Sequence, residues 1–346
     1  MLMPVIIRGD SGMPPPGDSG WPGNPPRGFR HRLAAGQFAV TAEIGPPRGA
    51  DTAPVAAKAR LLRDRVDAVN ITDNQSAAVR LSSLAGSVAA LAAGVEPIMQ
   101  LTCRDRNRIA LQSELLSASA LGIPNVVIMT GDHPRHGDHA DAMPVFDLDS
   151  IQLLKVATAM RDEGRLMSGG ALKPAPNWLL GAVENPPPAA TMAAAVAGHD
   201  SPDLQDAATW RLAAKIEAGA QFVQTQFVFD VPAFAAWMAR VRDLGLDQRC
   251  HILAGVGPIR SHRALAHLAG IPGVSIPDRV SDRLTSLPAG TDRLRQEGEK
   301  LCTEIIAGLT GIPGVAGVHV MAIGAESSVP GILQQAGLPV REPLSR

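Results

Sequence analysis

The chain has 346 residues, a formal net charge of -1, 45% apolar residues and 19% charged residues. This length suits one large α/β domain, and the nearly neutral charge gives no reason to expect binding to nucleic acid or an anionic membrane. No apolar run approaches the roughly 18 residues that a membrane-spanning helix needs. The three cysteines, Cys103, Cys250 and Cys302, are widely separated in the sequence, which favours a reducing, cytoplasmic compartment over a disulfide framework.

Residues 1–30 are rich in proline and glycine and include the stretch MPPPGDSGWPGNPPRG. Both residue types interrupt helices and central strands, and the segment lacks the long apolar core of a secretory signal. We therefore expect a disordered tail over residues 1–30, followed by one catalytic domain over residues 31–346.

From Gln37 onward, short apolar segments of β type alternate with longer segments of helical spacing. This alternation predicts an α/β fold, specifically a (β/α)8 or TIM barrel of eight parallel strands. The expected strands are Phe38–Ile44, Ala68–Thr72, Pro97–Thr102, Asn125–Thr130, Asn177–Ala182, Gln221–Phe227, His251–Gly255 and Gly317–Ile323. The expected helices are Ala53–Arg65, Ala77–Ala93, Arg106–Leu121, Asp149–Asp162, Asp203–Ala218, Val231–Leu244 and Ser261–Ala269. Functional side chains should gather at the carboxyl ends of the strands, where the βα loops converge.

Glu43 lies near the end of the first expected strand, FAVTAEI, and strand alternation places it on the same face as Thr41. A carboxyl group at the mouth of an apolar barrel is a candidate general acid, and an ion pair with a nearby Arg or Lys is the alternative. Asp132, in MTGDHP, directly follows the fourth expected strand. It either anchors a ligand or caps the following turn.

Gln224 and Gln226 lie on one face of the sixth expected strand, so two amides are expected to point toward one site. An amide both donates and accepts hydrogen bonds, which suits a heterocyclic ligand. Pairing with other polar residues at the rim is the alternative.

The loop from His133 to His139 carries three histidines at a spacing of three residues. Loop spacing of this kind is less specific than HExxH on a helix, so we expect no metal site here. We expect instead either a loop that covers a cofactor or a polar surface loop. No GxGxxG follows a strand and no GxxxxGK[ST] occurs, so Rossmann and P-loop nucleotide binding are not supported. Cys103 has no histidine beside it in the pattern and is disfavoured as a nucleophile.

A series of motifs, taken in order, resembles the methylenetetrahydrofolate reductase family. The motifs are TAEIGPP, VNITDN, QLTCRDRNR, MTGDHP with VFDLDS, LLGAVENP, KIEAGAQFVQTQFVFD and GVHVMAIG. The resemblance runs from about Phe38 to Leu338 and is closest to the branch with the long GDHPRHGDH loop. It implies a cytoplasmic flavoprotein oxidoreductase of one-carbon metabolism and methionine biosynthesis, which uses FAD to reduce 5,10-methylenetetrahydrofolate to 5-methyltetrahydrofolate.

The same resemblance implies roles for individual residues. Glu43 matches the general acid that protonates nitrogen 10 of the folate, Asp132 matches a carboxylate near the flavin, and Gln226 matches a glutamine that contacts folate, with Gln224 beside it. The residues implied to hold FAD are Thr72, Gln100, Thr130, Gly131, Asp132, Asp147, Gly181, Asn185 and Lys215. Lys215 is implied to meet the pyrophosphate.

Three departures from the best-known NADH-dependent members concern the cofactor rather than the acid. Gln100 stands in place of a histidine, Thr130 in place of an arginine and Gly181 in place of an aromatic residue. Ala264 and Leu268, after GVGPIR, stand in place of a glutamine and a phenylalanine that hold folate and nicotinamide in those members. The electron donor is therefore left open between NADH or NADPH and another reduced carrier or a redox partner protein. The further alternatives are the same reaction without tightly bound flavin, a folate-binding partner subunit, and an unrelated barrel lyase with Glu43 as its base. A homo-oligomer is the general expectation.

Overall fold

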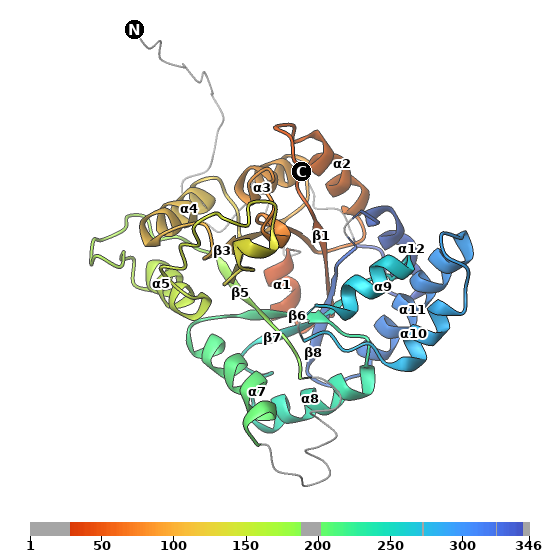
Figure 1. Ribbon diagram of the computed structural model, residues 1–346. Coiled ribbons are helices and arrows are strands. Elements are labelled where there is room, and N and C mark those ends of the chain that lie inside the picture. Colours follow the sequence, from red (N-terminus) through yellow and green to blue (C-terminus); the bar gives the residue numbers. More distant parts are fainter. Residues whose placement is uncertain (1–27, 188–201, 272, 323, 342–346) are drawn as a thin grey trace.

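The computed structural model describes residues 28–187, 202–271, 273–322 and 324–341. Eight parallel strands form a closed barrel in the order β1 to β8, with helices arranged around it (Figure 1). The strands are β1 (Ala39–Ile44), β2 (Ala68–Ile71), β3 (Pro97–Thr102), β4 (Asn125–Met129), β5 (Leu179–Glu184), β6 (Phe222–Phe227), β7 (His251–Val256) and β8 (Val315–Val320). The predicted (β/α)8 fold is confirmed, and each predicted strand overlaps an observed one.

Helices connect consecutive strands and cover the outside of the barrel. The α-helices are α1 (Phe29–Ala34), α2 (Ala53–Leu62), α3 (Ser83–Ala92), α4 (Arg108–Ala120), α5 (Ser150–Asp162), α7 (Pro202–Glu217), α8 (Val231–Asp243), α9 (His262–Ala269), α10 (Asp278–Thr285), α11 (Asp292–Thr310) and α12 (Val329–Gln335). Short 3-10 helices are η1 (Gln75–Ala77), η2 (Pro134–His136) and η3 (Glu326–Ser328). Within the described ranges, no helix has both the length and the apolar character needed to cross a membrane.

The predicted start of the second expected helix at Ala77 is wrong, because the observed helix, α3, begins at Ser83. At the predicted start, the backbone has left-handed φ angles of 45°, 56° and 54° at Asn74, Ser76 and Ala77. An α-helix cannot pass through such angles. The side chain of Ser82 then caps α3 by accepting a backbone N–H of its first turn.

Helix α1 closes the amino-terminal end of the barrel. Phe29 and Leu33 are 0% and 2% exposed and pack with apolar residues from the first halves of the strands. The Phe29 ring meets the Phe222 ring edge to face, with centroids 5.1 Å apart. The predicted tail boundary at Arg30 is therefore too late, because Phe29 is already a buried helical residue. Residues 1–27 of that predicted tail lie outside the described residues.

A buried carboxyl group anchors this helix. Glu96 accepts the Phe29 N–H at 3.1 Å and the Asn125 side-chain amide at 2.7 Å. Burial raises the pKa of Glu96, against the lowering effect of these two hydrogen bonds. Glu96 therefore links the start of α1, through Oε2, to the start of β4, through Oε1.

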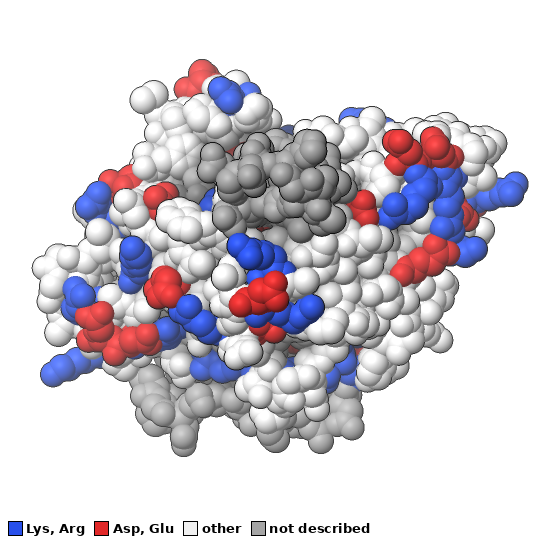
Figure 2. Space-filling model, turned by 90° about the horizontal axis from the view of Figure 1, so that it is seen from below, with Lys and Arg blue, Asp and Glu red and all other residues white. Residues whose placement is uncertain are grey.

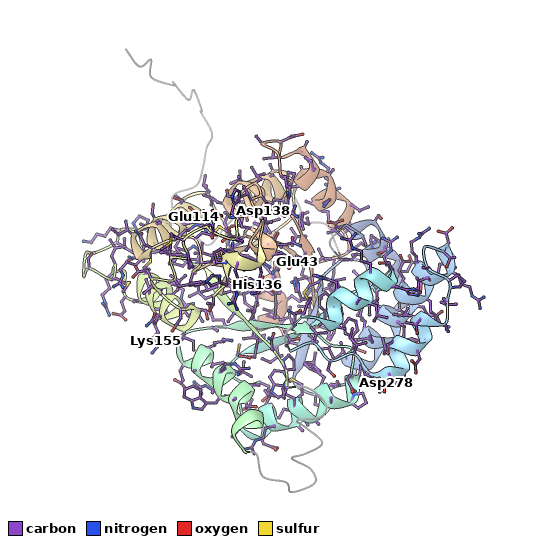
Figure 3. All side chains as sticks on the ribbon, in the orientation of Figure 1. Glu43, Glu114, His136, Asp138, Lys155 and Asp278 are labelled. Atoms are coloured by element: carbon purple, nitrogen blue, oxygen red, sulfur yellow. The ribbon has the colours of Figure 1, made fainter. Side chains whose placement is uncertain are left out.

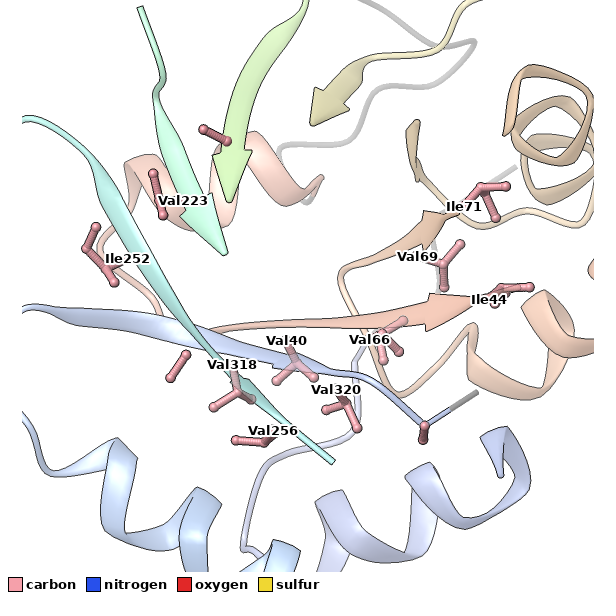
Figure 4. Close-up of a cluster of buried hydrophobic side chains, with 14 of the residues drawn as sticks. Val40, Ile44, Val66, Val69, Ile71, Val223, Ile252, Val256, Val318 and Val320 are labelled. Carbon is pink, nitrogen blue, oxygen red and sulfur yellow. The ribbon is translucent and has the colours of Figure 1, made fainter. Parts of the chain in front are cut away.

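The outer faces of the strands pack against the helices and form the main core (Figure 4). Val40, Val69, Val223 and Val318 are each 0% exposed in this layer. Because successive residues of a strand point to opposite faces, the residue next to each of them points into the barrel. Those four neighbours are polar and at most 2% exposed: Thr41, Asn70, Gln224 and His319. The barrel therefore has an apolar lower interior beneath a polar layer.

The surface carries charges of both signs. Figure 2 shows Lys and Arg interspersed with Asp and Glu over one face of the molecule. Arg283, for example, pairs with both Glu297 and Glu304. A mixed surface of this kind provides little long-range attraction for a polyanion.

Candidate active site

Glu43 lies at the carboxyl end of β1, inside the ring of helices (Figure 3). Its side chain is 14% exposed. The Oε2 atom accepts a hydrogen bond from Gln100 Nε2 at 3.1 Å and lies 3.5 Å from His319 Nε2. Among the described residues, its side-chain partners are an amide and an imidazole rather than the Arg or Lys of the alternative interpretation. This carboxyl group is accessible enough to exchange a proton. Its two neighbours hold it in place and can stabilise its negative charge.

Gln224 is placed inside the barrel, as strand alternation predicts, but it does not present a free amide. It is 2% exposed and exchanges two hydrogen bonds with Asn70, at 2.6 and 3.0 Å. Its Nε2 also donates to Thr41 Oγ1 at 3.2 Å. A role for Gln224 in contacting substrate is therefore not supported, because its amide is already engaged within the polar layer.

Gln226 is only partly buried and lies where the pairing between β6 and β7 is irregular. Its Oε1 accepts the N–H of Phe227 at 3.0 Å. The second predicted amide is thus at the rim, where a ligand could reach its remaining hydrogen-bonding groups. Its contact with folate stays a prediction.

The turn after β4 presents three of the predicted flavin residues at the rim. Thr130 and Asp132 are exposed, and Thr130 Oγ1 donates to Ser150 Oγ at 3.2 Å. Gly131 has a φ of 88°, and a Cβ atom at this position would lie 3.0 Å from the Cβ of Thr102. Glycine is therefore required both for the backbone conformation and for the close approach of this turn to β3.

Arg104, which the sequence did not single out, supports this turn from below. It is 3% exposed and pairs with Asp105 through two hydrogen bonds of 2.7 Å. The same guanidinium donates to the backbone oxygens of Asn74 at 3.2 Å and Asp132 at 3.4 Å. Arg104 therefore ties together the loops that follow β2, β3 and β4.

The loop with the three histidines is bound to the neighbouring loops of β1 and β2. Asp138 accepts the Val79 N–H at 3.2 Å, and its carboxylate lies 3.4 Å from Arg48. His133 Nδ1 accepts the N–H of Arg135 at 3.1 Å. The side chain of Arg135 in turn donates to His136 Nε2 at 3.0 Å. Two of the three histidines thus make local hydrogen bonds within the loop.

Three other predicted flavin residues have varied surroundings. Thr72 is 2% exposed and donates to the side chain of Gln75 at 3.3 Å. Asp147 accepts three hydrogen bonds of 2.8 Å from Arg108, and these hold the pKa of Asp147 at about 2. Asn185 is exposed, directly after β5. Of the three, Asn185 is the most accessible to a ligand.

Lys215 does not offer an unpaired charge for a pyrophosphate. It is 9% exposed, and its Nζ donates to Glu184 Oε2 at 2.7 Å and to the Val183 carbonyl at 2.6 Å. Glu184 also accepts from Arg211 at 2.9 Å. The implied role for Lys215 is therefore not supported by this structure, because its charge is compensated at the end of β5.

Gly181 is also placed differently from the flavin position that the resemblance implies. It is buried on the inner face of β5, and an added Cβ would lie 2.3 Å from the ring of Phe222. Its absent side chain makes room for that ring and not for a ligand at the rim. Gly181 is thus a packing residue of the lower barrel.

The packing of Gly181 against Phe222 predicts the result of Gly181→Ala. We expect the free energy of unfolding, measured by urea titration, to fall by about 1–3 kcal/mol because the methyl group overpacks the barrel interior. Gly331→Ala on α12 is the matched control, since a Cβ there meets nothing within 4 Å and should add about 0.5–1 kcal/mol. Unchanged stability together with lost flavin binding would restore the cofactor interpretation of Gly181.

Cys103 is completely buried, and burial raises its pKa to about 12. A thiol in this environment is a poor source of thiolate, which agrees with the expectation that it is not a nucleophile. His319, in contrast, was missed although it approaches Glu43. The sequence could have indicated His319 as a site residue, because alternation along β8 places it on the inner face between Gly317 and Met321.

The chain matches one protein-family model over most of its length. A family model described as methylenetetrahydrofolate reductase matches residues 28–337. The chain belongs to the methylenetetrahydrofolate reductase family. A probable methylenetetrahydrofolate reductase (NADPH) of Caenorhabditis elegans is 24% identical over 245 residues, which are 71% of this chain and 33% of that protein. A 5,10-methylenetetrahydrofolate reductase of Pectobacterium carotovorum is 23% identical over 62% of this chain and 60% of its own length.

The chain spans 33% and 36% of the length of two eukaryotic family members, from Caenorhabditis elegans and Schizosaccharomyces pombe. A solved structure from Clostridium thermocellum, described as an uncharacterized protein that binds two copies of 5-methyl-5,6,7,8-tetrahydrofolic acid, has a TM-score of 0.60 at 15% identity. The match covers 88% of this chain and 96% of that one. At this identity the likeness supports the fold.

Proposed function

We propose that this chain reduces 5,10-methylenetetrahydrofolate to 5-methyltetrahydrofolate, with Glu43 as the general acid. The observation that carries the proposal is the position of Glu43 at the carboxyl end of β1, with its carboxyl group partly exposed and in contact with Gln100 and His319. Membership of the methylenetetrahydrofolate reductase family supplies the substrate class.

The proposed reaction requires a proton from the protein and a hydride from an electron donor. The Glu43 O–H bond breaks as nitrogen 10 of the folate gains the proton, and the bond from nitrogen 10 to the bridging carbon breaks. The resulting cation takes a hydride at that carbon, which becomes the methyl group. The exposed carboxylate of Asp132 would stabilise the cation electrostatically, and Gln226 would hold the folate ring by hydrogen bonds.

The residues implied to hold FAD fit this cofactor in part. Thr130, Gly131, Asp132 and Asn185 are accessible at the rim and would hold the flavin, whose reduced form would supply the hydride. The other implied residues have partners within the protein. Lys215 is paired with Glu184, Gly181 packs against Phe222, and Gln100 donates a hydrogen bond to Glu43. These engagements favour, as a second candidate, the same reaction with weakly held flavin or another electron carrier.

The visible absorption spectrum of the purified protein tests both versions. We expect a flavin band, either as purified or after FAD is added and unbound FAD removed, that bleaches with NADH or NADPH and returns with methylenetetrahydrofolate under anaerobic conditions. A band that ignores both nicotinamides but returns with folate after chemical reduction identifies a different donor. Protein that neither retains FAD nor converts the folate with any donor contradicts the proposed function.

A further inference from the structure

His319 connects Glu43 to the buried polar layer of the barrel. The imidazole lies on β8, is 2% exposed, and uses its two ring nitrogens on different partners. Nδ1 lies 2.9 Å from Thr41 Oγ1, and Nε2 lies 3.5 Å from Glu43 Oε2. A buried imidazole with one partner at each nitrogen has a fixed orientation, and its tautomer is decided by those partners.

The hydrogen bonds behind His319 favour one position for its proton. Gln224 Nε2 can only donate, and it donates to Asn70 Oδ1 and Thr41 Oγ1. A hydroxyl oxygen that accepts from an amide still has one proton to donate, and Nδ1 of His319 is its partner at 2.9 Å. With Nδ1 as the acceptor of that proton, the neutral ring carries its own proton on Nε2, which faces Glu43.

We infer that His319 is a positioning residue that presents an Nε2–H group to Glu43, in an orientation set by the Thr41 hydroxyl. The inference deepens the proposed function and rests on it for the role of Glu43 as an acid. It assigns the polar layer of Thr41, Asn70 and Gln224 to the support of that one carboxyl group.

The consequence for the reaction lies in the charge that develops on Glu43. When the Glu43 O–H bond breaks and the folate nitrogen gains the proton, the carboxylate is left with Gln100 Nε2–H at 3.1 Å and His319 Nε2–H at 3.5 Å. Both donors are in place before the charge forms, which is the condition for efficient electrostatic stabilisation. Distances of this kind commonly shorten in the complex with substrate. His319 keeps its own proton throughout.

The charged groups nearby do not duplicate this function. Among the described residues, His319 is the titratable group that contacts Glu43. Asp73, at the end of β2, is paired with Arg106 at 2.7 Å and also accepts from Thr102. The stabilisation of the Glu43 carboxylate should therefore depend mainly on His319 and Gln100.

Thr41→Val tests the inference, because it removes the hydroxyl group with little change in volume. Without that donor, His319 can place its proton on Nδ1 and turn a lone pair toward Glu43, which favours the protonated carboxyl group. We expect kcat for folate reduction to fall by on the order of tenfold with KM changed by less than about twofold. The alkaline limb of the kcat profile should move to higher pH.

Thr158→Val is the matched control, since the Thr158 hydroxyl also donates one hydrogen bond, at 2.9 Å to Ala218 O, on the outer helix α5. It should change neither kcat nor the pH profile. A Thr41→Val protein with wild-type kcat and an unmoved alkaline limb would overturn the inference. A fall in kcat without movement of that limb would also overturn it, because loss of packing alone predicts that result.

A second measurement does not depend on turnover. NMR of protein labelled with 15N-histidine reports the tautomer of His319, whose signal is assigned by its loss in His319→Gln. We expect the Nε2–H tautomer in the wild type and a shift toward Nδ1–H in Thr41→Val. An Nδ1–H tautomer in the wild type, or one indifferent to Thr41→Val, would contradict the inference. Failure of the wild type to reduce the folate would instead contradict the proposed function, while the NMR result still decides the arrangement around Glu43.

Discussion

Replacing Glu43 with Gln should lower the rate of methylenetetrahydrofolate reduction by about 10²- to 10⁴-fold, the usual contribution of a general acid. The amide has nearly the size of the carboxyl group but no proton of suitable acidity, so ring opening loses its proton source. The rate is measured under anaerobic conditions from consumption of the folate, with FAD and NADH or NADPH, and with a chemically reduced carrier as a third donor.

Two controls separate chemistry from folding in this experiment. The thermal midpoint and any flavin band of Glu43→Gln should stay close to those of the wild type, since neither needs the acidic proton. Glu217→Gln, on the exposed end of α7 and paired with Arg249, should leave the rate unchanged. Full activity in Glu43→Gln would remove this residue from the mechanism, and another group would then have to supply the proton.

Phe29→Ala should reduce the free energy of unfolding by about 3–5 kcal/mol, as expected for loss of a buried aromatic side chain. Phe29 is 0% exposed, and its ring contacts Phe222 at the centre of the lower barrel. Removal leaves a cavity that the closed barrel cannot easily fill, because the surrounding side chains are fixed on different strands. Urea unfolding followed by circular dichroism measures the loss.

The series at this position distinguishes packing from a peripheral role of α1. Phe29→Leu retains most of the apolar volume and should lose less stability than Phe29→Ala. Leu33→Ala removes the second buried residue of α1 and should cost about 2–5 kcal/mol. If Phe29→Ala unfolds at the same urea concentration as the wild type, α1 is not part of the cooperative unit, and the bottom of the barrel is stable without it.

The barrel could be predicted from sequence because each strand is a short apolar run between turn signals, and such runs do not depend on distant partners for recognition. The inward direction of Thr41, Glu43 and Gln224 followed from strand alternation alone. The start of α3 could not be predicted, since the left-handed angles at Ser76 and Ala77 are set in the packed loop region, where Gly137 approaches the backbone of Ala77.

The partners of the site residues were harder to predict than their directions. Alternation places Gln224 inside the barrel but does not show that Asn70, 154 residues earlier, takes up its amide. In the same way, the sequence shows a lysine at position 215 but not that Glu184 neutralises it from the end of β5. Hydrogen bonds between strands and helices far apart in the chain depend on barrel closure, which no local pattern records.

The closure of the barrel by α1 also bears on the order in which the protein folds during synthesis. Phe29 is made before its aromatic partner Phe222, which follows 193 residues later on β6. At a translation rate of roughly 5–20 residues per second, that interval lasts on the order of ten seconds or more. Throughout it, the apolar face of α1 lacks its final partner. Docking of α1 is therefore a late, long-range event that raises the contact order and slows folding.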